Sequence, residues 1–383
     1  MRWLRLLLVG ACLAAAGGAS AAGGADGVDR LAIASRLVAD GLHDRAAAIL
    51  DEVPEPDADD PDRTRYLTLR GMVALHLGQH AEAAVDLAAA LADPEVDPLL
   101  NLHLAQARLS SNDPAGAIRA LDAAGPSAEA VPGAWLLRGK AAQALDQPQA
   151  AWDALVAGRE RFPAHVGLGR QHLLLMVELG LHSTAAREAR RVLPAIGADA
   201  TLWVTLGDAL RRAGAVTGAR WVLEGARLRF PESTDARVAL ARACLDADLP
   251  LCAGEVLQEA AVLDPVFASE AAECFRRAGA YGRATYLNGL VVDPAIKLRQ
   301  RLGLLLEQER FISAAALEPR AGRLGLLDDG QVAYALAYAH FRTGSPERSE
   351  ALLGTLSDPD LARQVTGLRE AMERCRAAGA ACD

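Results

Sequence analysis

Few side chains in this 383-residue chain have the types and spacing of a reactive site. His76 and His80 are four residues apart, as in helical zinc sites, but Gly78 between them indicates a helix end, so we interpret both as surface histidines. The acidic stretch 54–62 lacks the glycine and terminal glutamate of a calcium loop. Phosphate-binding, GxSxG and HExxH motifs do not occur. The sequence therefore predicts no enzymatic activity, metal or cofactor.

The cysteines are the side chains for which we expect covalent chemistry. Cys244 falls near the end of one expected helix and Cys252 early in the next, while Cys375 and Cys382 flank an expected turn. In an exported protein each pair can form a disulfide. The alternative for each is a pair of reduced thiols, and Cys274 could compete for Cys244 or Cys252.

The amino terminus is similar to a secretory signal peptide. The first five residues include two arginines, an apolar run follows over 6–16, and residues 19–21 are the small-residue run Ala-Ser-Ala. We therefore expect residues 1–22 to direct export and the mature protein to be periplasmic. The alternative is a lipoprotein anchored to the membrane at Cys12, since residues 9–12 loosely resemble a lipobox. Later stretches are shorter than the roughly 18 apolar residues of a spanning helix.

The net charge argues against a nucleic-acid partner. The chain contains 40 lysines and arginines and 49 aspartates and glutamates, which gives a formal charge of −9. Proteins that bind nucleic acid usually carry a basic stripe, and no such stripe is present here.

One residue pattern returns every 34 positions from Thr64 to Phe267. This period indicates a regular framework that positions the side chains described above. The copies begin at Thr64, Pro98, Pro132, Val166, Ala200 and Thr234. The eighth position is small in five of them, namely Gly71, Ala105, Gly139, Gly207 and Ala241, and Leu173 is the exception. The twentieth position is always alanine, at Ala83, Ala117, Ala151, Ala185, Ala219 and Ala253. Small residues at facing positions predict two helices packed closely together.

The copy from Ala200 to Ser233 resembles the tetratricopeptide repeat family in its Trp203, Gly207, Ala219 and Pro231. The resemblance implies an all-α, right-handed superhelical solenoid of about nine helix-turn-helix repeats with a C-terminal capping helix. We divide the chain into a degenerate first repeat and acidic loop (27–63), six regular repeats (64–267), irregular repeats (268–358), and a capping helix and tail (359–383).

Members of that family usually bind partners in a concave groove lined by the first helix of each repeat. The resemblance implies a groove lined here by Met72, Leu75, Leu102, Gln106, Leu136, Lys140, Arg170, Leu174, Asp208, Arg211, Arg242, Tyr334, Tyr338 and Phe341. An apolar strip followed by basic residues fits an extended or helical segment with acidic flanks. The alternative is that the repeats bury the apolar positions against one another. In that case Tyr334, Tyr338 and Phe341 would pack against the terminal helix, which would contact them through Leu361, Val365 and Leu368.

From this resemblance we expect a non-enzymatic protein–protein interaction scaffold in the bacterial cell envelope. Its setting would be an assembly, secretion or export complex for an exported polymer or an outer-membrane protein. The alternative is a groove that binds glycan or peptide, so that the protein acts as a cargo carrier or chaperone.

Overall fold

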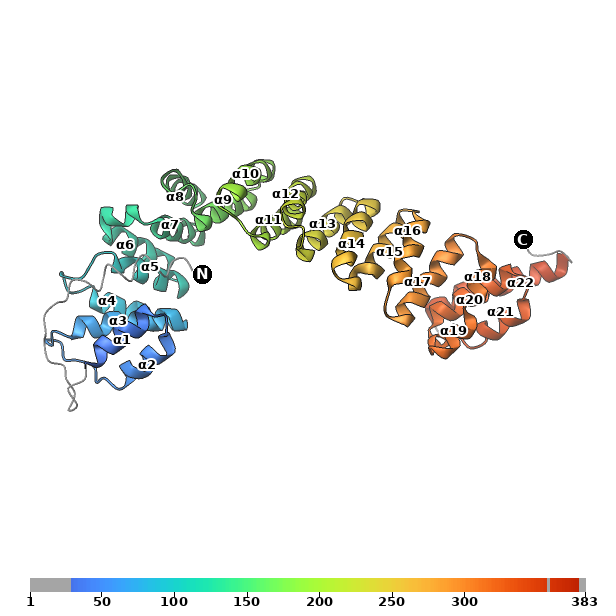
Figure 1. The fold of residues 1–383 in the computed structure, drawn as a ribbon, viewed down its shortest axis with the longest axis horizontal. Coiled ribbons are helices and arrows are strands. Elements are labelled where there is room, and N and C mark those ends of the chain that lie inside the picture. The colour runs from blue at the N-terminus through green and yellow to red at the C-terminus, as the bar shows by residue number, and fades with distance from the viewer. Residues whose placement is uncertain (1–28, 357–358, 379–383) are drawn as a thin grey trace. The chain divides into compact units, whose positions relative to one another are not determined.

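The computed structural model describes residues 29–356 and 359–378, and all regular secondary structure in these ranges is helical (Figure 1). The expected signal peptide (1–22), Cys12 and Cys382 lie outside the described residues. The chain divides into two compact units, and the division falls in the sequence at α10 (His182–Ala195).

The first unit contains residues 29–179 and 192–197 of the described chain. Its helices are α1 (Arg30–Ala39), α2 (His43–Asp51), α3 (Arg63–Leu77), α4 (His80–Ala90), α5 (Leu100–Ser110), α6 (Pro114–Ala123), η1 (Gly125–Ala130), α7 (Pro132–Ala144), α8 (Pro148–Arg161) and α9 (Val166–Glu178).

The second unit contains residues 180–191 and the described chain from 198 onward. Its helices are α11 (Ala200–Arg212), α12 (Val216–Arg229), α13 (Thr234–Asp246), α14 (Pro250–Leu263), η2 (Pro265–Phe267), α15 (Ala268–Arg277), α16 (Tyr281–Leu290), α17 (Pro294–Glu307), α18 (Phe311–Ala315), α19 (Glu318–Arg323), η3 (Leu326–Asp328), α20 (Gly330–Arg342), α21 (Pro346–Leu353), η4 (Pro359–Leu361) and α22 (Ala362–Ala378).

Within each unit the helices pack as consecutive hairpins, each with a first and a second helix (Figure 1). The first unit holds the pairs α1/α2, α3/α4, α5/α6 and α7/α8, and the second holds α11/α12, α13/α14, α15/α16, α17/α18 and α20/α21. The helices α7, α9, α11 and α13 begin at residues where the 34-residue frame begins. The expected all-helical repeat fold is therefore confirmed within each unit.

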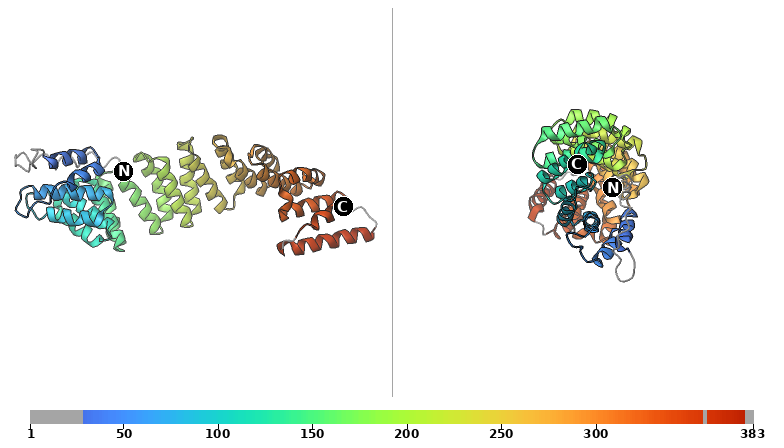
Figure 2. Two further views of the ribbon diagram at one scale, coloured as in Figure 1. Left: turned by 90° about the horizontal axis from the view of Figure 1, so that it is seen from below. Right: turned by 90° about the vertical axis from the view of Figure 1, so that its left-hand side faces the viewer.

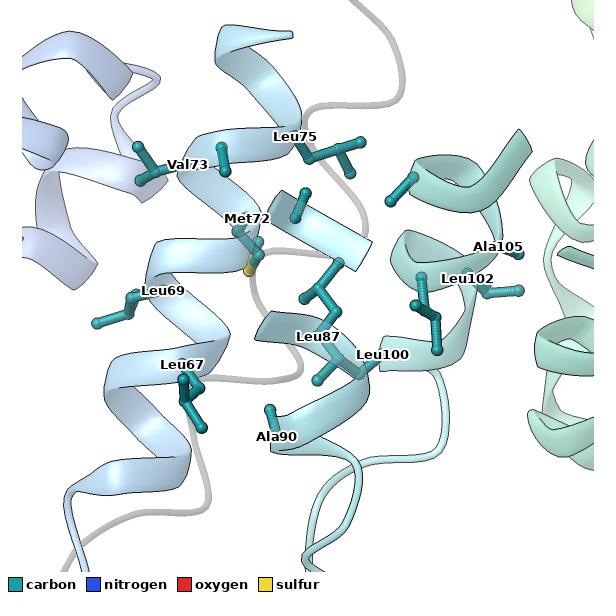
Figure 3. Close-up of a cluster of buried hydrophobic side chains, with 14 of the residues drawn as sticks. Leu67, Leu69, Met72, Val73, Leu75, Leu87, Ala90, Leu100, Leu102 and Ala105 are labelled. Carbon is teal, nitrogen blue, oxygen red and sulfur yellow. The ribbon is translucent and has the colours of Figure 1, made fainter. Parts of the chain in front are cut away.

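Small residues hold the two helices of a hairpin close together. All six alanines at the twentieth position are 0% exposed. On the first helix, a Cβ added at Gly71 would lie 2.8 Å from Cγ of Leu87 on α4, and one at Gly207 would lie 2.4 Å from Cγ of Leu223 on α12. Figure 3 shows Leu87 in the buried cluster between α3, α4 and α5. These approaches are the physical reason for the repeat's small positions.

The turn inside each hairpin requires left-handed backbone. At this turn in the regular repeats, residues with positive φ are spaced 34 apart, at Gly78, Asn112, Asp146, Gly180, Gly214 and Asp248. Glycine adopts this conformation most readily, and asparagine and aspartate are the next most tolerant residues. The repeat frame therefore fixes where each first helix ends, whichever of these residues stands there.

The irregular part of the chain also follows from its sequence. The hairpin α15/α16 has helices of only 10 residues each, where the repeat frame is short. Pro319 divides the next second helix into α18 and α19, because proline cannot continue a helix from within it. The last helix, α22, packs on α20 and α21 (Figure 2), with Leu368 and Met372 buried.

Candidate functional site

The expected groove residues lie on the first helices of their hairpins. Met72 and Leu75 are on α3, Leu102 and Gln106 on α5, Leu136 and Lys140 on α7, and Arg170 and Leu174 on α9, all in the first unit. The second unit carries the others, with Asp208 and Arg211 on α11, Arg242 on α13, and Tyr334, Tyr338 and Phe341 on α20.

Four of these residues belong to the core, which corrects their assignment to an open groove. Met72, Leu75 and Leu102 are at most 9% exposed and share one buried cluster (Figure 3). Phe341 is also 9% exposed and is buried in a cluster that includes Leu368 of α22. The physical reason is that neighbouring hairpins bury these apolar positions against one another, as in the alternative interpretation.

Arg211 also differs from the expected basic surface, because its charge is used within the fold. Its guanidinium donates to the Asp246 carboxylate at 2.9 Å and to that of Asp208 at 3.2 Å. These two carboxylates raise the pKa of Arg211 through hydrogen bonds. Asp246 lies on the next first helix, so the contact joins consecutive repeats. We therefore remove Asp208 and Arg211 from the candidate partner-binding surface.

The other two cations of the expected groove in the first unit are Lys140 and Arg170. Together with Gln106, Leu136 and Leu174 they define what we call the Lys140 surface. Lys140 and Arg170 are exposed, and the other three side chains are half-buried. Neither cation has a carboxylate within 4.0 Å among the described residues. Desolvation, followed by the like charge of Arg170, lowers the pKa of Lys140 below its ordinary value. The two cations are thus close, uncompensated, and suited to a carboxylate ligand.

A hydrogen-bonded chain fixes one side of this surface. Gln171 donates to the side-chain oxygen of Gln143 at 2.6 Å, and Gln143 donates to the carboxylate of Glu178, also at 2.6 Å. These bonds join α7 to α9, and Gln171 directly follows Arg170 in the chain. The spacing between the two helices, and therefore between Lys140 and Arg170, is held by groups within the fold.

In the second unit the aromatic residues of the expected groove, Tyr334, Tyr338 and Phe341, are half-buried or buried against other side chains. Tyr338 lies edge-on to Phe311 with ring centroids 5.8 Å apart, and its hydroxyl accepts a hydrogen bond from Arg342 at 2.9 Å. The Arg342 guanidinium also lies 4.1 Å from the Phe311 ring centre. Tyr334 and Tyr338 are half-buried beside the cluster that contains α22 residues. Arg242 of α13 is exposed.

In the second unit, Cys244 of α13 and Cys252 of α14 form a disulfide. Their Cα atoms are 5.9 Å apart, within the range that a disulfide spans. Cys274 stays a buried thiol whose pKa is raised chiefly by desolvation. Cys375 is half-buried on α22, and its expected partner, Cys382, lies outside the described residues.

The histidines have a setting that the sequence motif alone did not reveal. His76 is exposed, as expected, but its ring stacks on that of His43 with centroids 4.0 Å apart. Burial, and secondarily the charge of His76, lower the pKa of His103 to about 4. These residues come from three hairpins, so the repeat spacing is the sequence signal from which their proximity could have been predicted. In the part of the chain that the structure describes, no three histidine, cysteine or acidic side chains converge as metal ligands.

Solved structures of low sequence identity match parts of the chain. No protein-family model and no curated protein matches the chain. A tetratricopeptide repeat protein from Parabacteroides merdae is 16% identical, and the match covers 66% of this chain and 98% of that one, with a TM-score of 0.46. Pseudomonas aeruginosa PilF is 19% identical over 52% of this chain and 93% of its own, with a TM-score of 0.29. Human IFIT1 with PPP-AAAA is 14% identical over 84% and 88%, with a TM-score of 0.31.

Among the described helices, none is long and apolar enough to cross a membrane. Within each unit the 34-residue frame, the closely packed hairpins and the left-handed turns define a tetratricopeptide-like helical repeat fold.

Proposed function

We propose that this protein is a non-enzymatic scaffold that binds a protein partner through the Lys140 surface of its first unit. Stacked hairpins give a rigid array of first helices, and such arrays commonly serve as extended binding surfaces. The partner we infer is an extended or helical protein segment that carries acidic side chains beside apolar ones.

The observation that supports this proposal is the uncompensated pair of cations on neighbouring helices. Desolvation, and after it the charge of Arg170, disfavours the protonated form of Lys140, and an added carboxylate would favour it. Leu136 and Leu174 are half-buried, so part of each apolar side chain is available for contact beside the charges. Elsewhere in the fold many arginines already have carboxylate partners, as Arg70 has in Asp86 at 2.7 Å.

The cellular setting we propose is the bacterial cell envelope, within a complex that assembles, secretes or exports a polymer or an outer-membrane protein. Two observations support an exported protein: the signal-like pattern of residues 1–22, and the disulfide between Cys244 and Cys252. Disulfides persist chiefly in oxidising compartments such as the periplasm. Lipidation at Cys12 is the alternative route to the same compartment.

A cargo-carrying function for glycans would need an accessible aromatic platform, and here Phe311 and Arg342 occupy the surroundings of Tyr338. Peptide cargo would use the same Lys140 surface as a fixed partner does. The two functions differ in the lifetime of the complex, because a carrier must release its ligand.

The experiment is affinity capture from intact envelopes with the charge-reversed variant Lys140→Glu/Arg170→Glu. The matched control is Arg45→Glu/Arg119→Glu, which makes the same change in net charge at two exposed arginines of α2 and α6. We expect the control to recover the same partner as wild type, and the test variant to recover at least about tenfold less, the effect of about 1.4 kcal/mol. Equal recovery by both variants would remove this surface from the proposed function.

A further inference from the structure

Two histidine rings from neighbouring hairpins lie face to face in the first unit. His43 is the first residue of α2, and His76 lies in the last turn of α3. Their ring centroids are 4.0 Å apart, and the ring planes differ by 15°. Nδ1 of His76 donates to the carbonyl oxygen of Met72 at 2.8 Å, and both ring nitrogens of His43 are buried. A proton added to His43 would therefore place a buried charge directly against the ring of His76.

The stacked rings lie where the amino-terminal hairpin docks on α3. Both α1 and α2 contact α3. Leu31 and Leu50 of this hairpin share one buried cluster with Leu69 and Val73 of α3. In Figure 3, Leu69 and Val73 point toward the α1/α2 hairpin. A change in the charge of the stacked rings therefore acts on the contact that covers this apolar face of α3.

The charged groups around the stacked rings do not offset a second positive charge. At the helix ends nearest to the rings, the titratable and charged side chains are Arg36, Asp40, Asp44, Arg45, His80, Glu82 and His103. Asp40 already accepts a hydrogen bond from Arg36 at 3.2 Å. Asp44 and Glu82 are exposed, where solvent weakens their attraction for a cation. Within the described chain, neither His76 nor His103 has a carboxylate within 4.0 Å.

The third ring of this group, His103 of α5, shows that a charge on His76 affects its neighbours. Burial, and after it the charge of His76, lower the pKa of His103 to about 4. His103 therefore stays largely neutral at pH 5, a pH at which an ordinary histidine is protonated. In mild acid the two stacked rings, and not His103, take up protons.

We propose that His43 and His76 form a pH switch, which keeps the α1/α2 hairpin docked on α3 at neutral pH and releases it in mild acid. While one ring is neutral, the stack can persist. When both rings are protonated, two like charges lie 4.0 Å apart and repel each other. The amino-terminal end of α2 also disfavours a cation at His43, because the helix dipole is positive there.

The direction of the pH dependence follows from proton linkage. In the released hairpin both histidines accept protons with the ordinary pKa of about 6.5, whereas the docked pair resists the second proton. The released state therefore binds more protons, and docking weakens as the pH falls below about 6.5. Between pH 7 and pH 5 one resisted proton favours release by about tenfold.

The test is hydrogen exchange of the full chain at pH 7 and pH 5, followed by mass spectrometry. Each measured rate is divided by the chemical exchange rate of the unfolded peptide at the same pH. We expect α1 and α2 to lose protection by about tenfold at pH 5. The hairpin α7/α8 of the same unit contains no histidine and should change less. Unchanged protection of α1 and α2, or an equal loss in α7/α8, would overturn the proposal.

A substitution at the exposed ring separates this switch from other titrating groups. In His76→Phe the stacked ring remains but cannot take up a proton, so α1 and α2 should keep at pH 5 the protection that they have at pH 7. The matched control is His182→Phe on α10, which should lose protection as wild type does. Circular dichroism verifies that both variants are folded. An equal loss in His76→Phe and wild type would assign the pH dependence to other groups and contradict the switch.

Nuclear magnetic resonance of the histidine rings in the wild-type chain is a second measurement, which needs no substitution. With histidine labelled at Cε1, the chemical shifts report the protonation of His43 and His76 separately. We expect the second of these rings to gain its proton only as α1 and α2 lose protection. Two protonated rings in a hairpin that stays protected at pH 5 would show that the rings separate without release, and would overturn the proposal.

Discussion

The left-handed backbone at the hairpin turn strongly restricts which residue types can occupy that position. The sequence predicts left-handed glycines at Gly78, Gly180 and Gly214, and the structure has positive φ at all three. Asn112 and Asp146 occupy the same frame position with φ of 65° and 55°. Their conformation could have been predicted from the 34-residue period, although the residue type alone gives a weaker signal.

Glu309 is the least suited of these residues, because it holds φ of 54° without the local hydrogen bonding of asparagine or aspartate. We expect Glu309→Gly to stabilise the protein by about 1 kcal/mol, since glycine relieves the left-handed strain. Urea-induced unfolding followed by circular dichroism measures the effect. Arg119→Gly, at an exposed position inside α6, should instead destabilise by about 1 kcal/mol. A Glu309→Gly protein no more stable than wild type would contradict this account of the turn.

His103 makes stability depend on pH. Its pKa is lowered from 6.5 to about 4 in the folded protein, chiefly by burial. As the pH falls below 6.5 the unfolded chain takes up a proton that the native state does not, so stability decreases until the pH reaches about 4.

We expect His103→Gln to flatten this dependence, because the glutamine side chain does not titrate. The measurement is the midpoint of urea unfolding at pH 7 and at pH 5 for wild type and variant. The control His182→Gln, on α10, should keep the wild-type difference between the two pH values. An equal fall in stability for His103→Gln and wild type would show that other groups account for it.

Individual side chains of the candidate site were less predictable than the turns. The repeat frame places Met72 and Lys140 on equivalent faces of their helices, yet one is buried and the other exposed. Burial depends on how much neighbouring hairpins cover, and the ion pairs of Arg211 depend on Asp246 in the next repeat. Both are tertiary properties that one repeat's pattern does not contain.

At the scale of helices, a small residue on the first helix of a hairpin lies opposite a large residue on the second helix. Gly71, Gly139 and Gly207 on first helices each approach a leucine of the second helix. In the fourth copy the frame has Leu173 at the small position and Ala189 where the other copies have leucine. Both residues are buried. The residue sizes at these two frame positions are therefore reversed in the fourth copy.

The close approach of Gly207 to Leu223 predicts that substitutions at the two positions have non-additive effects on the free energy of unfolding. Gly207→Ala should destabilise by about 1–3 kcal/mol, since the added methyl overlaps Leu223. Leu223→Ala alone should cost about 2–5 kcal/mol, and the double variant less than the sum of the two. Gly303→Ala on α17 is the control, because a Cβ there meets no atom within 4 Å, and it should be neutral or stabilising. Additive effects of the two substitutions would contradict the packing account.

For the whole molecule, the period of 34 made the helical repeat fold predictable, because each short helix is stable only when stacked on its neighbours. The surfaces were not predictable in the same way. The first unit presents uncompensated cations on α7 and α9, and the second exposes large apolar side chains on α14 and α16. Val262 of α14 and Tyr286 of α16 lie on second helices, to which the expectation of a binding groove did not extend.

Partner binding by the Lys140 surface is the central claim, and site-specific photocrosslinking in intact cells tests it most directly. A photoreactive amino acid would replace Leu174 or Gln106, which are half-buried on that surface, and Arg119 of α6 as the control. Circular dichroism verifies that each variant is folded. We predict a covalent adduct with one and the same protein from positions 174 and 106, and none from 119. Folded variants that give no adduct at 174 and 106, or an equal one at 119, would contradict the account.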